Sequence, residues 1–136
     1  MAATTPRQFH TQQVHYLRKT VNYNDTNIGT GVIMGTLPAG SQILPFASTI
    51  TVRTAFNAGT TNNLLIGTAA GGNQICATAD SAAGSTGSKT LALATITTNS
   101  YQASDTDIYV TYTQTGGAAN AGVATITLAF TVNNDG

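Results

Sequence analysis

The sequence offers few side chains that could perform acid–base, nucleophilic or metal chemistry. Its 136 residues include five acidic residues, all of them Asp, two His and one Cys. His10 and His15 are five positions apart, so in an extended chain they face opposite sides and cannot hold one metal ion from a single strand. Asp105 and Asp107 would share a face and could contribute to a Ca²⁺ site, but before a strand such residues more often form Asx turns, as we also expect for Asp25. We therefore predict no enzymatic activity, no metal site and no cofactor.

The low charge of the chain argues against several classes of partner. Charged residues make up 7% of the sequence and the formal net charge is +0, so the composition indicates neither nucleic acid nor an anionic membrane as a partner. The apolar runs are far shorter than the ~20 residues of a membrane helix, and residues 1–13 lack the apolar segment of a secretion signal. The single cysteine, Cys76, lies in an apolar run and is expected to be a buried thiol. These features together predict synthesis in a reducing cytoplasm.

Short alternating segments separated by turn residues predict an all-β fold. Thr, Val and Ile fit a pleated surface, and the absence of Glu leaves few residues for the wet face of a helix. The clearest patterns are residues 107–115, with apolar residues at every second position, and residues 123–132, with five apolar residues on one face. Further strands are predicted at Val14–Tyr23, Thr30–Leu37, Gln42–Leu44, Ser48–Phe56, Leu64–Gly67, Gln74–Thr78 and Lys89–Ile96. This spacing predicts an antiparallel, jelly-roll-like β-sandwich of about eight strands.

The predicted sandwich domain spans residues 14–136 and follows an extended N-terminal arm at residues 1–13. The arm sequence is polar, has no clear period and contains Pro6, which cannot donate to a strand ladder. It is either a frayed terminus or a segment that orders against a neighbouring molecule. The cations Arg18, Lys19 and Arg53 are likewise either solvated residues of edge strands or partner contacts.

The order of several motifs is informative beyond the strand pattern. An LPAG turn at residues 37–40 leads into an alternating strand, a TAFxxGT loop at residues 54–60 and a short LxIGT strand at residues 64–68. A YVTY strand at residues 109–112, a Gly- and Ala-rich loop and a final alternating strand complete the series. This order, over most of residues 30–132, resembles that of tailed-bacteriophage virion proteins. Members of that family are small jelly-roll proteins that decorate the capsid, usually as trimers, or domains of head and tail fibres.

The resemblance implies a capsid decoration, or cement, protein that is made in the host cytoplasm and resides on the virion surface. Its partners would be the major capsid protein and two further copies of itself, and the loops Thr68–Asn73 and Asp80–Ser88 would form the outer, exposed end. The family brings no catalytic residues. Aromatic and Arg side chains are typical interface anchors, so the implied contact residues are Arg7, Phe9, His10, Val14, Tyr16, Arg18 and Lys19.

Other functions remain open at this point. One is a head-fibre, tail-fibre or baseplate component that binds a host surface or glycan, although sugar sites on sandwiches usually need aromatic platforms and the chain has no Trp. Another is a cellular adhesin or carbohydrate-binding module, for which an export signal would be expected. An enzyme is the least favoured, because nothing in the sequence selects a pair of converging carboxylates.

Overall fold

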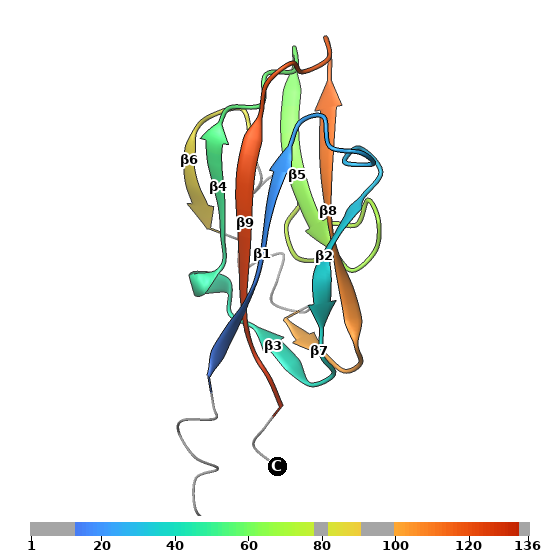
Figure 1. Ribbon diagram of the computed structural model, residues 1–136, viewed down its shortest axis with the longest axis vertical. Helices are drawn as coiled ribbons and strands as arrows, with labels where there is room; N and C mark the ends of the chain where they lie inside the picture. Colours follow the sequence, from blue (N-terminus) through green and yellow to red (C-terminus); the bar gives the residue numbers. More distant parts are fainter. Residues whose placement is uncertain (1–12, 78–81, 91–99, 134–136) are drawn as a thin grey trace, which may run out of the picture.

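The computed structural model describes residues 13–77, 82–90 and 100–133, and these form a β-sandwich of two antiparallel sheets (Figure 1). The prediction of an all-β antiparallel sandwich is therefore confirmed. The predicted arm lies outside the described residues, apart from Gln13. The elements are β1 (Val14–Asn22), β2 (Val32–Leu37), β3 (Ser41–Ile43), the 3₁₀ turn η1 (Pro45–Ala47), β4 (Thr49–Thr54), β5 (Thr61–Gly67), β6 (Gly87–Thr90), β7 (Tyr101–Gln102), β8 (Thr106–Thr115) and β9 (Val123–Thr131).

The last strand, β9, organises the larger sheet. This sheet has six strands in the order β6-β4-β9-β3-β7, and β1 pairs with β9 along its whole length. The opposite edge of β9 is shared, because β4 pairs with its first half and β3 with its last residues. The smaller sheet has the order β2-β8-β5. Successive strands repeatedly pass from one sheet to the other, so the sandwich depends on contacts between residues far apart in the sequence.

The core lies between the inner faces of the two sheets. Apolar side chains at alternate positions of β8 and β9 point inward, as their sequence pattern predicts, and Ile108, Val110, Ile126 and Leu128 are all 0% exposed. Alternation of this kind arises because successive side chains on a strand point to opposite faces. The same cluster includes Phe56 and Tyr112, whose rings contact each other with centroids 4.6 Å apart.

Several predicted elements differ from the structure. Of the strand predicted at Gln74–Thr78, residues 74–77 are not a strand, and residue 78 lies outside the described residues. Cys76, buried as expected, forms an isolated bridge with Ile66. The strand predicted at Ser48–Phe56 ends at Thr54, because a bulge at Arg53 shifts its register against β9. Of the strand predicted at Lys89–Ile96, residues 91–96 lie outside the described residues.

The two loops predicted to be exposed are both anchored to the sandwich. The loop at residues 68–73 covers the outer face of the smaller sheet, where the Gly71 amide donates to Thr111 Oγ1 at 3.1 Å and Thr111 is buried. In the loop at residues 80–88, Ala83 is buried and its carbonyl accepts a hydrogen bond from the Phe56 amide. Both loops therefore contribute to the packing of the sandwich.

Candidate functional site

Strand β1 presents some of the predicted contact residues to solvent and turns others inward. Val14, Tyr16 and Arg18 are exposed on the outer face of the six-stranded sheet. Lys19 occupies the opposite face of β1, between Leu17 and the buried Val21, and is half-buried. Arg18 and Lys19 therefore lie on different faces of β1, although they are neighbours in the sequence. The remaining predicted contacts, Arg7, Phe9 and His10, lie outside the described residues.

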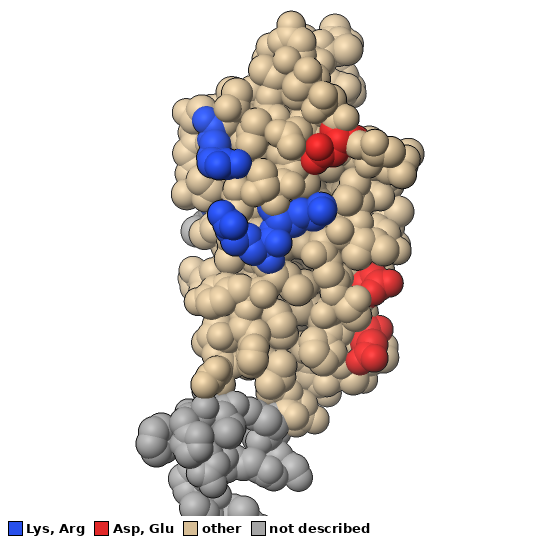
Figure 2. All heavy atoms as spheres, viewed as in Figure 1, with Lys and Arg blue, Asp and Glu red and all other residues tan. Residues whose placement is uncertain are grey.

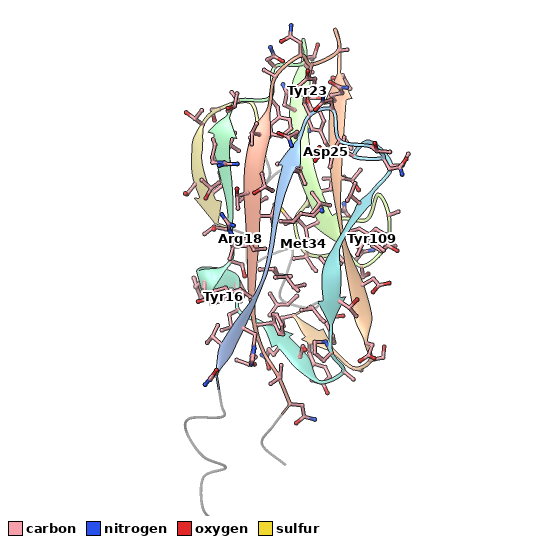
Figure 3. The ribbon with its side chains drawn as sticks, in the orientation of Figure 1. Tyr16, Arg18, Tyr23, Asp25, Met34 and Tyr109 are labelled. Carbon is pink, nitrogen blue, oxygen red and sulfur yellow. The ribbon has the colours of Figure 1, made fainter. Side chains whose placement is uncertain are left out.

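Four large apolar side chains are exposed near the start of β1, and we call them the apolar patch. They are Val14 (45% exposed), Tyr16 (58%), Phe46 (81%) and Tyr101 (59%). The register places Val14 and Tyr101 at the same level of the sheet, because Val14 faces Thr131, Thr131 faces Gln42 and Gln42 faces Tyr101 across adjacent strands. Residues directly opposite one another share a face of the sheet. Figure 3 shows Tyr16 projecting from β1 beside η1, the turn that carries Phe46.

The turn η1 carries Phe46 between β3 and β4, while the backbone of β9 beside it remains hydrogen-bonded. Between β3 and β4, the Leu44 amide donates to the Ala129 carbonyl at 2.8 Å. Ser48 Oγ accepts a hydrogen bond from the Ala129 amide at 2.9 Å and donates one to the Leu44 carbonyl at 2.8 Å. The backbone amide and carbonyl of Ala129 in β9 are thus both hydrogen-bonded in the gap between β3 and β4, and these bonds hold the turn that carries Phe46 in place. A large apolar side chain held in this way suits a docking anchor.

Above the apolar patch, the outer face of the six-stranded sheet is rich in hydroxyl groups. Thr20 Oγ1 lies 3.0 Å from Thr125 Oγ1, and Thr51 Oγ1 lies 3.0 Å from Ser88 Oγ. Arg18 and Arg53 are exposed on the same face, and we call this pair the basic face. Figure 2 shows basic side chains over the region of β1, β9 and β4.

The described acidic residues hold turns and neighbouring strands in place. Asp105 Oδ1 accepts a hydrogen bond from the Ala39 amide at 2.8 Å, and Asp107 Oδ1 accepts one from Thr36 Oγ1 at 2.6 Å. The Asx turns predicted for these two residues are therefore replaced by bonds to the β2–β3 segment. Asp25 accepts hydrogen bonds from the amide and side chain of Asn22. No group of three or more His, Cys, Asp or Glu that could hold a metal ion occurs within residues 13–77, 82–90 and 100–133.

The opposite end of the sandwich is closed by amide side chains. Asn57 Oδ1 accepts hydrogen bonds from the amides of Asn120 (2.9 Å) and Ala121 (3.0 Å), and Asn57 Nδ2 donates to Asn120 Oδ1 at 2.7 Å. Just below, the Tyr112 hydroxyl donates to Asn62 Oδ1. Burial raises the pKa of Tyr112 above its ordinary value, and this effect outweighs the opposing hydrogen bond with the Ala58 backbone. This end exposes backbone and small polar groups in place of large apolar side chains.

Phe46 and Tyr101 were not among the residues predicted to form contacts. Phe46 follows Pro45 in a short break between two strands, where an aromatic residue has no place in an alternating pattern. Tyr101 begins a strand of two residues. An aromatic residue beside a strand-breaking Pro was the available signal, whereas the exposure of Tyr101 depends on pairing between distant strands.

Comparison with known proteins finds the same fold in a chain from a solved phage capsid structure. No model of a protein family and no curated protein sequence matches this chain. A chain from the solved structure of the cyanophage Pam1 capsid asymmetric unit superposes with a TM-score of 0.61 and 14% sequence identity. The match covers 97% of this chain and 94% of that chain. At this identity the likeness shows a shared fold. Among the described residues, no helix is long and apolar enough to cross a membrane.

Proposed function

We propose that this protein is a non-enzymatic capsid decoration protein of a bacteriophage, which binds the outer capsid surface as a trimer and stabilises the shell. The main support is the shared fold with a chain of the cyanophage Pam1 capsid asymmetric unit, which extends over nearly the whole of both chains. The phage-like order of motifs in the sequence supports the same function independently. The proposed partners are therefore the major capsid protein and further copies of this chain.

The apolar patch is the proposed docking surface for the shell. Tyr16 and Phe46 combine exposed aromatic area with fixed backbone positions, and Arg18 follows Tyr16 on the same face of β1. Residues of these types contribute most to binding energy at protein interfaces. The patch lies at the end of the sandwich where β1 begins, so the segment 1–13 joins the domain beside it.

Binding of this kind would stabilise the shell by mass action. A protein that binds only the assembled lattice favours that lattice by its own binding free energy. A trimer engages three sites at once, so contacts that are individually weak give strong overall binding. It also matches a local three-fold axis of a capsid.

Co-sedimentation with empty phage heads tests the proposal. The wild-type protein is expected to pellet with heads, and a Tyr16→Ser, Phe46→Ser variant should bind at least about tenfold more weakly, since each side chain is an interface anchor. Lys89→Ser is the control, because Lys89 is a long side chain on β6, outside the apolar patch and the basic face. Deletion of residues 1–13 should also abolish binding while the sandwich remains folded. Wild-type protein that never pellets with heads, or a double variant that binds as tightly as the control, would refute the assignment.

A second function is favoured by the aromatic character of the patch. Tyr16, Phe46 and Tyr101 provide flat apolar groups beside the polar side chains of Gln42 and Thr131. Aromatic platforms with polar neighbours are typical of sugar-binding surfaces. A fibre or baseplate component that binds a host glycan would therefore use the same patch. Binding to a panel of host polysaccharides, lost in the Tyr16→Ser, Phe46→Ser variant, would favour this function over shell binding.

A further inference from the structure

Two oppositely charged surfaces lie on different sides of the sandwich. The basic face consists of Arg18 on β1 and Arg53 at the bulge of β4, both exposed. We call Asp105 and Asp107 the acidic edge; both are exposed, and they lie where β8 begins beside β2. In Figure 2 basic side chains face the viewer over β1, β9 and β4, whereas acidic side chains lie along the side where β2 and β8 run. Asp25, labelled in Figure 3, lies apart from both surfaces, next to Asn22 at the end of β1. The basic face and the acidic edge are thus separated in space.

The carboxylates of the acidic edge are held in fixed positions. Oδ1 of Asp105 is bound by the Ala39 amide, and Oδ1 of Asp107 is bound by the Thr36 hydroxyl. A carboxylate has a second oxygen that can accept further hydrogen bonds, and a guanidinium group offers paired donors that match it. Because both acidic side chains are already oriented, little further conformational entropy is lost when they pair with a cation.

Each charged surface adjoins an exposed apolar side chain. On β1, Tyr16 lies two residues from Arg18 and therefore on the same face. On β8, Tyr109 lies two residues from Asp107, and its register partner Ile33 is 50% exposed. Apolar contacts surrounded by polar and charged groups are the usual composition of a protein interface.

We propose that Arg18 and Arg53 of one copy pair with Asp105 and Asp107 of the next copy, and that this head-to-tail contact closes the ring of the trimer. The inference rests on the proposed trimer and specifies which surfaces form it. A contact between two different surfaces produces a closed ring only when successive copies turn about an axis. In Figure 2 the basic face is turned toward the viewer and the acidic edge lies at the rim, so the two surfaces are on adjacent sides of the molecule, and this arrangement is compatible with a closed ring.

Charge reversal tests the contact. The molar mass of the full-length protein would be measured by sedimentation equilibrium in about 0.05 M and about 0.5 M NaCl, since salt screens exposed charge pairs. The wild type is expected to form trimers that weaken at high salt. Arg18→Glu with Arg53→Glu, or Asp105→Lys with Asp107→Lys, should raise the dissociation constant at least about 100-fold through like-charge contacts. All four substitutions together retain the formal net charge of +0 and should restore the trimer.

Two controls separate the contact from changes in folding or net charge. Asp105→Asn with Asp107→Asn keeps an oxygen to accept the bonds from Ala39 and Thr36, so it should weaken association without unfolding the turn. Lys89→Glu changes the charge outside both surfaces and should leave the trimer intact. A wild type that is monomeric, a trimer unaffected by either reversal, or a folded quadruple variant that stays monomeric would each overturn the inference. Head co-sedimentation of the wild type and of the Asp105→Lys with Asp107→Lys variant, which leaves the apolar patch and Arg18 unchanged, measures the proposed function separately.

Discussion

The two ends of the sandwich differ in the side chains that they expose. At the end formed by residues 57–62 and 114–122, side-chain amides satisfy the loop backbone, and Phe56 packs beneath them against Tyr112. At the end where β1 begins, Val14, Tyr16, Phe46 and Tyr101 remain exposed. The first end stabilises the fold and the second offers a surface for a partner. Substitutions at the first end should therefore change the free energy of unfolding, and substitutions at the second end should change binding.

Removal of the Phe56 ring should have the largest effect on stability. Phe56 is 1% exposed and contacts the Tyr112 ring, and Gly122 passes so close to it that a Cβ at that position would meet the ring. Phe56→Ala is expected to lower the free energy of unfolding by about 3–5 kcal/mol through lost burial and a residual cavity. Denaturant unfolding followed by circular dichroism would measure this. A loss below about 1 kcal/mol would mean that this end does not stabilise the fold as described.

Loss of the Asn57 side chain should have the next largest effect. Asn57→Ala removes three hydrogen bonds and leaves the amides of Asn120 and Ala121 without this acceptor. Because these hydrogen bonds are exposed to solvent, the expected decrease in unfolding free energy is about 0.5–1.5 kcal/mol. Asn57→Asp keeps the acceptor oxygens and should lose less. Equal losses for the two variants would show that the acceptor bonds contribute nothing.

The stability contributed by the Tyr112 hydroxyl should depend on pH. The raised pKa means that the folded state keeps this proton at pH values where the unfolded chain has begun to release it. The contribution is therefore complete below the ordinary tyrosine pKa of about 10 and is lost as the pH rises above that value. Tyr112→Phe should remove this part of the alkaline decrease and cost about 1 kcal/mol at neutral pH, where the bond to Asn62 is lost. Identical alkaline unfolding profiles for the variant and the wild type would contradict this assignment.

Substitution of Phe46 should have the smallest effect on stability. Its side chain is 81% exposed, so Phe46→Ser removes little buried area. The unfolding free energy should change by less than about 0.5 kcal/mol, as for most surface substitutions. A thermal unfolding experiment alongside Phe56→Ala would compare a Phe at each end directly. A large loss for Phe46→Ser would indicate that η1 has a structural role beyond presenting this side chain.

The sequence predicted most reliably those strands that bury a single face. Strands β8 and β9 each bury one apolar face, so their alternation predicted the inward residues correctly. The strand at residues 123–132 was predicted to bury one face only, with mostly Thr or Ala on the other. Ala129 is nevertheless fully buried on that other face, at the position to which Leu44 and Ser48 are hydrogen-bonded. The burial of Ala129 depends on pairing between segments far apart in the sequence, which a local sequence pattern cannot predict.

The exposure of the candidate site residues was predictable where alternation along one strand sufficed. Val14, Tyr16 and Arg18 were predicted to be contact residues from their types, and the period of two along β1 places them on the exposed face and Lys19 on the other. Their role in a contact stays a prediction. Phe46 and Tyr101 could not be assigned to the same surface from the sequence. Their proximity to Tyr16 arises from the order of β1, β9, β3 and β7 in the sheet, which is set by long-range pairing.

The central position of β9 has a consequence for how the protein forms. Three strands from the first half of the chain, β1, β3 and β4, all pair with this last strand. During synthesis these strands emerge well before their common partner, so the larger sheet can assemble only after β9 has been synthesised. Non-local pairing of this kind slows folding and leaves strand edges exposed in the meantime. A chain that ends before β9 would lack the centre of the sheet and could not form this sandwich.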